Sequence, residues 1–321
     1  MAPEIVRVAA VQAAPVFLDR DATVDKASGL IEKAASDGAQ VIVFPEVFVS
    51  GYPDWAWRTS GWPDGALFGR LLEQAVVVPS DATRRLGAAA RDAGAVVAIG
   101  IDERDEYGST VYNSLLYLGP DGEVLGVHRK LVCTGMERLM WGQGDGSDLD
   151  VYDTAIGRIG GLICWENYMP LARSAVYAQG PDILVAPTWD NTDAWVPTLR
   201  HIAKEARVHV IGVSPCQRAR DVIGAFPGLD ELYPNPDDWL SQGNAAIAGP
   251  DGDLLAGPLI GEEGILSADL DLSAARESRR MFDPTGHYAR PDVFRLVVDA
   301  RPRRTVSFES PDASSDEPPE G

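Results

Sequence analysis

Short apolar runs alternate with segments of helical spacing along most of this chain. The runs are rich in Val, Ile and Ala, which is typical of buried strands, and the segments between them carry apolar residues at helical intervals. We expect strands at 5–11, 41–44, 95–101, 114–118, 123–128, 156–163, 183–186 and 208–213, and helices at 21–37, 65–77, 81–92, 169–179 and 194–207. Strands that alternate with helices on this scale predict a layered α/β fold.

Two nearly identical stretches, 118–126 (LGPDGEVLG) and 248–256 (AGPDGDLLA), each place Pro-Asp-Gly between strand-like runs. Proline presets the first turn dihedral and glycine accepts a positive φ, so each stretch predicts a β-hairpin. Two interpretations stay open: two unrelated hairpins, or two halves built alike as two sheets that are each backed by helices. Because no change in composition marks a second domain, we expect a single domain over residues 1–304.

Acidic residues outnumber basic ones, 48 against 28, which gives a formal net charge of −20. This charge repels phosphate backbones and anionic membrane surfaces, so we expect neither nucleic acid nor a membrane as a partner. Part of the excess lies in 309–321 (ESPDASSDEPPEG), which has five acids and no base. The end of the chain, 305–321, is therefore expected to be an acidic, disordered tail.

The cysteines Cys133, Cys164 and Cys216 are widely spaced and odd in number, which argues against a disulfide framework. Reduced thiols suit the cytoplasm. The N-terminal stretch lacks the basic and apolar regions of a secretion signal, and no run approaches about 18 uninterrupted apolar residues. These features predict a soluble cytoplasmic protein.

Several common catalytic and binding motifs are missing from the sequence. It has no Gly-x-Ser-x-Gly, no P-loop, no Cys-x-x-Cys pair and no His-Glu-x-x-His. The glycine run at 142–146 is similar to a phosphate loop, but a poor helix opening follows it and Asp145 would repel a pyrophosphate. Ligands at zinc spacing are absent as well. We expect no metal and no organic cofactor.

Three residues whose side chains could take part in catalysis each follow an expected buried strand: Glu46, Lys130 and Cys164. Sites collect at the carboxyl ends of strands in layered α/β proteins. A free cysteine is usually a small core residue, whereas a charge directly after an apolar run either turns to solvent or is paired inside. A cysteine–histidine pair is the other arrangement to consider, but no local motif joins a histidine to Cys164. The histidines are His128, His201, His209 and His287.

Three long motifs stand in order along the chain: FPEVFVSGYP (44–53), HRKLVCTGMERLMWGQGDGS (128–147) and GGLICWENYMPLARSAVYAQG (160–180). Shorter matches are APTWD (186–190) and GHYARPDVF (286–294). Together they resemble the nitrilase family of the carbon–nitrogen hydrolase superfamily, and the resemblance runs from about residue 5 to 295. It implies an αββα sandwich of two mixed sheets with helices on both outer faces, in agreement with the expected strands and hairpins.

The resemblance also implies roles for single residues. Glu46 matches the family's general base, Lys130 its catalytic lysine, Cys164 its nucleophile and Glu137 a second glutamate that supports the site. A thiol with an ordinary pKa of about 8.5 needs a base or a lowered pKa in order to attack, and Glu46 can accept its proton. We expect Lys130 and the backbone N–H of Trp165 to stabilise the negative charge that develops later.

The stretch 160–170 gives Cys164 a particular local setting. We expect its two glycines to let the strand run close to its neighbours, and its Asn and Pro to begin the next helix. Cys164 would then lie on a short turn where N–H groups favour an anion. Although Glu166 is the nearest acid in sequence, we expect the partners of Cys164 to come from far upstream.

A nitrilase that converts a small organic nitrile to the carboxylic acid and ammonia, through a thioimidate and a thioester, is the expected function. An amidase or carbamoylase with the same Glu-Lys-Cys site is the alternative, a cyanide-hydrolysing enzyme is a narrower variant, and a non-catalytic scaffold is a different class. Tyr52, Trp165 and Trp189 are either walls of a substrate pocket or ordinary core aromatics.

Two residues depart from the family pattern. Pro is common where Cys133 stands and His where Asn167 stands, which puts the preferred substrate size in doubt. We assign Cys133 to packing. Family members assemble into dimers and often into spirals, so the resemblance implies a homodimer or a larger homo-oligomer.

Overall fold

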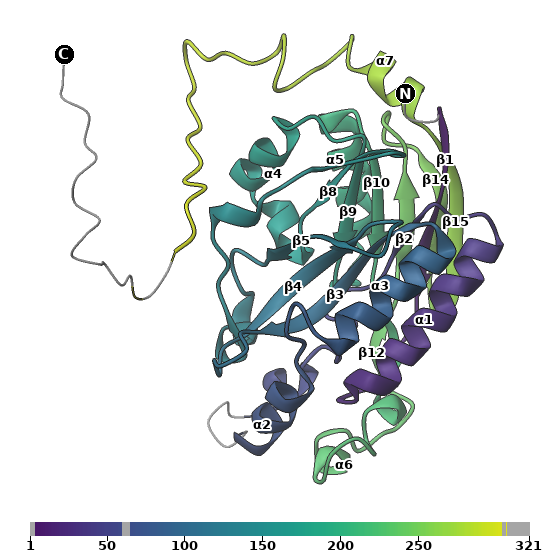
Figure 1. Ribbon diagram of the computed structural model, residues 1–321, viewed down its shortest axis with the longest axis vertical. Coiled ribbons are helices and arrows are strands. Elements are labelled where there is room, and N and C mark those ends of the chain that lie inside the picture. Colours follow the sequence, from purple (N-terminus) through teal and green to yellow (C-terminus); the bar gives the residue numbers. More distant parts are fainter. Residues whose placement is uncertain (1–3, 60–64, 304–305, 307–321) are drawn as a thin grey trace.

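The structure is a computed structural model and describes residues 4–59, 65–303 and 306 of the 321-residue chain. Two β-sheets pack face to face, and helices cover the outer face of each (Figure 1). The expected αββα sandwich is therefore confirmed. The expected boundary at residue 304 and the tail after it lie outside the described residues, apart from Val306.

The first sheet combines strands from both ends of the chain. Its strands are β1 (Ile5–Gln12), β2 (Val41–Val43), β3 (Val96–Arg104), β4 (Val111–Leu118), β5 (Val124–Arg129), β6 (Trp141–Gly142) and β15 (Gly264–Asp271). They lie in the order β15-β1-β2-β3-β4-β5, and β6 pairs with β4. β1, β2 and β3 run parallel to one another, while β15, β4 and β5 each run antiparallel to a neighbour.

The second sheet is built from the middle of the chain. Its strands are β7 (Tyr152–Thr154), β8 (Gly157–Gly161), β9 (Ile183–Pro187), β10 (His209–Val213), β13 (Ala245–Ala248) and β14 (Leu254–Leu259). They lie in the order β14-β13-β10-β9-β8-β7, with β8, β9 and β10 parallel and the other pairs antiparallel. A separate antiparallel pair consists of β11 (Cys216–Arg218) and β12 (Trp239–Gln242).

The two sheets repeat one pattern of strand directions. Read from β15 to β5 and from β7 to β14, each has an antiparallel edge strand, three parallel strands and then an antiparallel hairpin. The hairpins are those expected from the Pro-Asp-Gly stretches, and Gly122 and Gly252 have φ of +87° and +84° in their turns. Of the two interpretations left open by the sequence, the structure supports two halves built alike.

Helices pack on the outer faces because their apolar residues recur along one side. The helices are α1 (Arg20–Ser36), α2 (Gly65–Gln74), α3 (Asp81–Ala93), α4 (Pro170–Tyr177), α5 (Trp195–Ala206), α6 (Leu229–Leu232) and α7 (Leu272–Ser278). α1 and α3 share a core cluster with the first sheet, and α4 and α5 share one with the second. A third cluster, which includes Val43, Ile159 and Cys164, fills the space between the sheets.

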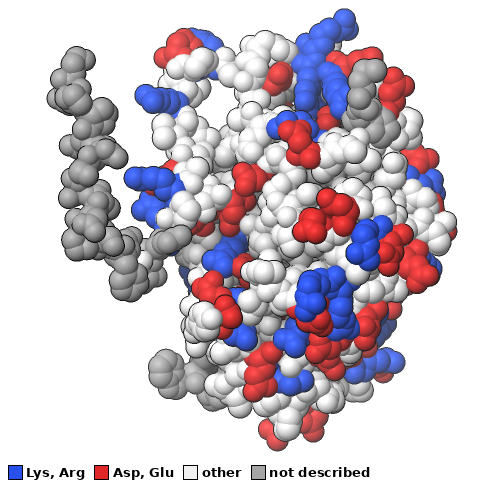
Figure 2. All heavy atoms as spheres, in the orientation of Figure 1, with Lys and Arg blue, Asp and Glu red and all other residues white. Residues whose placement is uncertain are grey.

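The surface and the chain end add two observations. Figure 2 shows acidic and basic side chains interspersed on the visible face, so the net charge does not form one continuous acidic patch there.

After α7 the chain runs along the outside of the sandwich as an extended arm, residues 279–303 (Figure 1, yellow). Among the residues that are described, no helix is long and apolar enough to cross a membrane.

Local expectations around residue 164 are right in one respect and wrong in another. A Cβ at Gly161 would lie 2.3 Å from the Val185 carbonyl oxygen, so the glycine does permit a close approach of β8 to β9. α4 begins at Pro170, as expected, but Met169 rather than Asn167 holds the N-cap position. The Asn167 amide instead donates to the carbonyls of Leu162 and Cys164, which makes it part of the cysteine turn.

We predict that Gly161→Ala destabilises the fold by about 1–3 kcal/mol, because the added methyl group meets a backbone oxygen that cannot move away. Gly29→Ala is the matched control: Gly29 is an exposed glycine of α1 with open space around its Cβ position, and the change should stabilise by about 0.5–1 kcal/mol. Urea unfolding of both variants tests this. Equal stability of the two variants would contradict it.

Candidate active site

The candidate catalytic residues lie where strands of the two sheets end. Glu46 follows β2 and Lys130 follows β5, two strands of the first sheet that point in the same direction. Cys164 follows β8 of the second sheet, separated from it by two residues. These side chains thus come together between the two sheets, after the carboxyl ends of the strands that precede them.

Lys130 is the centre of a buried ion-pair cluster. Its Nζ donates to Glu46 Oε1 at 2.7 Å and to Glu137 Oε2 at 2.8 Å, and all three side chains are almost completely inaccessible to solvent. Glu137 lies on the 3₁₀ helix η2 (Gly135–Leu139) and also accepts hydrogen bonds from Thr134 N–H and the Tyr52 hydroxyl. One ammonium thus neutralises one of two carboxylates, and the cluster keeps a net negative charge.

The charges in the cluster determine one another's protonation. Burial disfavours the ammonium of Lys130, but the facing carboxylates of Glu46 and Glu137 outweigh burial and hold its pKa well above the usual range. Burial raises the pKa of Glu46 against the opposing effect of Lys130. Lys130 therefore stays charged, and Glu46 is a stronger base than an exposed glutamate.

The two oxygens of Glu46 have different surroundings. Oε1 accepts from Lys130 and, at 2.7 Å, from the amide of Asn113. Oε2 is buried and has no hydrogen-bond partner among the residues that the structure describes. A buried carboxylate oxygen without a donor is costly unless something else occupies that position. Oε2 is therefore the oxygen of Glu46 that is chemically able to accept a proton.

Cys164 occupies a strained turn. It begins the 3₁₀ helix η4 (Cys164–Tyr168) with φ of +52°, a left-handed conformation that residues other than glycine rarely adopt. Its side chain is buried, and the Thr188 hydroxyl donates to the sulfur at 3.1 Å. The turn directs the thiol into the space between the sheets, where Cys164 is part of the apolar core.

The surroundings of Cys164 keep its thiol protonated. Burial, and then the charge of Glu46, raise the pKa of Cys164 to about 12, although Lys130 and Thr188 act in the opposite direction. At neutral pH the sulfur therefore carries its proton. A thiol in this state attacks an electrophile only if a base removes the proton during the attack.

The three candidate pocket aromatics have different positions. Tyr52 is buried, donates to Glu137 and stacks on Trp189 with ring centroids 4.3 Å apart. Trp165 lies next to Cys164 in the chain, but the residue is 49% exposed and its indole donates to Asp190. The structure thus brings Tyr52 and Trp189 to the cluster, whereas the side chain of Trp165 points away from it.

Asn113 and Thr188 contact the site but were not among the sequence candidates. Asn113 lies in β4, which begins three residues before the strand expected at 114–118. Thr188 directly follows β9, within the quoted stretch 186–190. The rule that located Glu46, a polar residue after a buried strand, applies equally to Thr188.

Other candidate groups are occupied elsewhere. Cys133 is buried with its thiol near the carbonyls of Trp141 and Gly142, which confirms the assignment to packing. His128 lies between Asp148 and Glu166 and so is not the partner of Cys164. Within the described ranges, no cluster of His, Cys, Asp and Glu is arranged to hold a metal ion.

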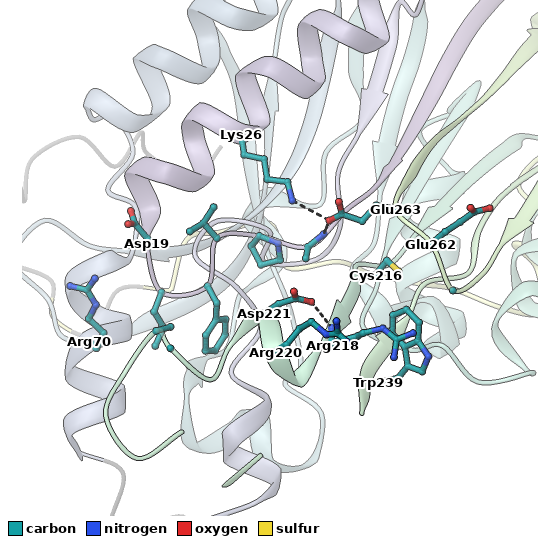
Figure 3. Close-up of a pocket in the computed structure, with 18 residues that line it drawn as sticks. Asp19, Lys26, Arg70, Cys216, Arg218, Arg220, Asp221, Trp239, Glu262 and Glu263 are labelled. Atoms are coloured by element: carbon teal, nitrogen blue, oxygen red, sulfur yellow. Dashed lines mark hydrogen bonds and ion pairs between the residues drawn. The ribbon is translucent and has the colours of Figure 1, made fainter. Parts of the chain in front are cut away.

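A cavity of about 770 Å³ lies apart from this cluster. Figure 3 shows residues of its wall, which include Lys26, Cys216, Arg218 and Trp239. Lys26 pairs with Glu263, and Arg218 stacks on Trp239, so these cations already have partners. Glu46, Lys130, Glu137 and Cys164 do not line this cavity. The candidate active site is identified by its buried charges and not by cavity size.

We predict that alkylation of Cys164 by iodoacetamide slows as the pH falls through a value above 4.5, the ordinary pKa of glutamate. Glu46 must be ionised to accept the thiol proton, and burial raises its pKa, so the loss begins at a higher pH than for an exposed carboxylate. Peptide mapping of the labelled protein measures the rate. Glu46→Gln should react slowly and lack this acidic limb; an unchanged limb in that variant would contradict the assignment.

Comparison with known proteins identifies the family. The carbon–nitrogen hydrolase family model matches residues 7–280. An aliphatic nitrilase of Sinorhizobium fredii is 46% identical, with 94% of this chain and 97% of the relative covered, and nitrilase 1 of Arabidopsis thaliana is 40% identical, with 94% and 89% covered.

Solved structures show the same fold at lower identity. A carbon–nitrogen hydrolase of Helicobacter pylori superposes with a TM-score of 0.71 at 22% identity, covering 91% of this chain and 97% of the other. The Nit3 protein of Saccharomyces cerevisiae, a nitrilase-superfamily member, gives the same TM-score and identity, with 89% and 97% covered. With the family match spanning most of the sequence, these similarities show that the chain belongs to the carbon–nitrogen hydrolase family.

Proposed function

We propose that this protein is a nitrilase, which hydrolyses a small organic nitrile to the carboxylic acid and ammonia. The observation that carries the proposal is the difference between the two oxygens of Glu46. Oε1 accepts hydrogen bonds from Lys130 and Asn113, whereas Oε2 has no donor in the described part of the chain. This second oxygen suits the transfer of a proton from the Cys164 thiol. The choice of nitriles is supported by relatives named as nitrilases at 40–46% identity.

In the first step, the sulfur of Cys164 attacks the nitrile carbon while Glu46 takes the thiol proton. A C–S bond forms and one π bond of the nitrile breaks. The nitrogen of the resulting thioimidate is basic, and protonated Glu46 returns the proton to it. The step adds the thiol across the triple bond without a free thiolate, which fits a cysteine whose pKa is raised to about 12.

In the second step, water adds to the thioimidate carbon with Glu46 as the base. Negative charge that develops in the tetrahedral intermediate is stabilised by the Lys130 ammonium and the backbone N–H of Trp165. The nitrogen gains a proton, the C–N bond breaks and ammonia leaves a thioester on Cys164. A second water hydrolyses the thioester to the acid and restores the thiol. These reaction steps require neither a metal nor an organic cofactor.

The tetrahedral intermediate has a second route. If the C–S bond breaks before the C–N bond, Cys164 is released as the thiol and the product is the amide. Release of some amide is supported by relatives at 40–42% identity that are named bifunctional nitrilase/nitrile hydratases. Proton delivery to nitrogen or to sulfur decides between the routes, and the Glu46 carboxyl is the group that supplies it.

Tyr52 and Trp189 are proposed as an apolar wall for the substrate. Their stacked rings join Glu137, through the Tyr52 hydroxyl, to Thr188, which precedes Trp189 and contacts the Cys164 sulfur. The indole of Trp165 is directed to Asp190 and is not part of this wall, so the proposed contribution of Trp165 is its backbone N–H.

We also propose that residues 1–304 form one domain, that the protein is cytoplasmic and that it is a homo-oligomer. Assembly is supported by the extended arm, which exposes large apolar side chains: Met281 is 67%, Phe294 77% and Val297 71% exposed. Sedimentation velocity checks the assembly, and a monomer at micromolar concentration would contradict it.

Incubation with aromatic, arylaliphatic and aliphatic nitriles, with acid, amide and ammonia all measured, tests the proposed reaction. At least one nitrile should give acid and ammonia. Cys164→Ala should abolish turnover, and Glu46→Gln should lower kcat by about 10²–10⁴-fold because the proton transfers lose their base. Cys133→Ala is the matched control, since it removes another buried thiol and should keep kcat within a few-fold.

The alternatives predict different results in the same assay. Turnover of amides or N-carbamoyl compounds with none of any nitrile would assign an amidase or carbamoylase. Turnover of cyanide alone would assign the cyanide-hydrolysing variant. A non-catalytic scaffold would convert nothing and would show Cys164 no more reactive toward an electrophile than Cys133 or Cys216.

A further inference from the structure

His128 forms a second buried charge cluster beside the candidate active site. Its Nδ1 lies 3.0 Å from Asp148 Oδ1 and its Nε2 lies 3.0 Å from Glu166 Oε2. Both ring nitrogens face carboxylate oxygens, so the imidazolium, which donates from both nitrogens, is the form that fits. Burial disfavours this charge, but Glu166 and Asp148 outweigh burial and raise the pKa of His128 to about 10.

Glu166 connects the two segments that carry the candidate lysine and cysteine. Its Oε1 accepts from the backbone N–H of Leu131 and its Oε2 from that of Ile163, both at 2.6 Å. Leu131 directly follows Lys130, and Ile163 directly precedes Cys164. One fully buried carboxylate therefore bonds the backbone next to each catalytic candidate.

Asp148 holds the other side of the lysine. Its Oδ2 accepts from the backbone N–H of Arg129 at 3.0 Å, and Arg129 directly precedes Lys130. Together with Glu166, Asp148 fixes the chain on both sides of Lys130. His128 neutralises part of the charge of the two carboxylates and connects them through its ring.

This arrangement joins the two sheets at the site. Lys130 follows β5 of the first sheet and Cys164 follows β8 of the second, so their separation depends on how the sheets are held together. Apolar packing between sheets is not directional and permits small sliding, whereas charged hydrogen bonds to backbone N–H groups fix a position. A displacement of about 1 Å between reacting groups can cost about 100-fold in rate.

We propose that Glu166, held by His128 and Asp148, is a positioning residue that sets the Lys130 and Cys164 segments in reacting geometry. It acts through these segments and does not exchange a proton with the substrate. The inference rests on the proposed function in one respect, namely that Cys164 is the nucleophile. It explains why the acid nearest to Cys164 in sequence carries no catalytic role of its own.

Glu166→Gln tests the proposal, because the amide keeps the shape but cannot accept both N–H bonds and loses its charge pairing with His128. We expect kcat for a nitrile to fall by about 100-fold with KM changed by less than about threefold. The rate of Cys164 alkylation by iodoacetamide should fall as well, since the base and thiol no longer meet. Mere loosening of the fold would expose the thiol and raise that rate.

Asp182→Asn is the matched control. Asp182 is also a buried carboxylate that pairs with a cation, Arg276, and accepts a backbone N–H, that of Arg158. It precedes β9 and so lies at the other end of the second sheet from Cys164. Asp182→Asn should lower the thermal midpoint comparably yet keep kcat and alkylation within about threefold of the native protein, as expected for a structural role remote from reacting groups.

If Glu166→Gln does not fold, Asp148→Asn replaces it as the test, because Asp148 is the partly exposed residue of the His128 cluster. This substitution should lower kcat and the rate of Cys164 alkylation by about tenfold. Native kcat and alkylation in a folded Glu166→Gln or Asp148→Asn variant would overturn the proposal, as would an equal loss in Asp182→Asn. If the native protein hydrolyses no nitrile, the proposed function fails, while the alkylation rates still decide whether Glu166 positions the cysteine.

Discussion

The buried ammonium of Lys130, shared between Glu46 and Glu137, is the interaction on which the rest of the site depends. Removing three charges from water is expensive, and breaking such a cluster by deleting one member leaves an uncompensated buried charge. The fold accommodates the cluster because the polar groups around it supply further hydrogen bonds, from Asn113 to Glu46 and from Tyr52 to Glu137. Burial, and then the charge of Glu46, raise the pKa of the neighbouring Cys164 thiol, so attack by the sulfur requires a base.

The architecture places the candidate site at the seam, the region where the two sheets meet. Two sheets with the same succession of strand directions meet through an apolar core. Glu46 and Lys130 come from one sheet, and Cys164 comes from the other. Two charge clusters lie at this seam. The first, around Lys130, includes two of the proposed catalytic residues, and the second, around His128, is bonded to the backbone next to Lys130 and Cys164. In this account the cluster around Lys130 transfers protons and stabilises charge. The cluster around His128 fixes the distance between the Lys130 and Cys164 segments.

Much of this could be predicted from the sequence, for identifiable reasons. Apolar runs located β1 to β5 and β8 to β10, and the Pro-Asp-Gly turn located the hairpin of β13 and β14, but β6, β7, β11, β12 and β15 were not expected. Glu46 and Lys130 stood out because a charge directly after a buried run must be solvated or paired. Glu137 was expected only through the family resemblance, and Asn113 was not expected, because it meets Glu46 only through tertiary packing. Thr188 could have been found by the rule that located Glu46, since it directly follows the buried strand β9. Glu166 was set aside as the partner of the thiol, and its bonds to Leu131 and Ile163 were not foreseen, because they depend on a turn geometry that local patterns do not encode. The direction of the Trp165 indole, toward Asp190, was equally hidden.

The central claim is that Cys164 is a protonated thiol activated by Glu46 at the moment of attack, and not a stable thiolate. Ultraviolet absorbance of the thiolate, recorded as the difference between the native protein and Cys164→Ala across a pH titration, measures this directly. The account predicts no difference at neutral pH, with thiolate absorbance appearing only toward the raised pKa of about 12. A full thiolate signal at neutral pH that disappears on acidification would contradict it.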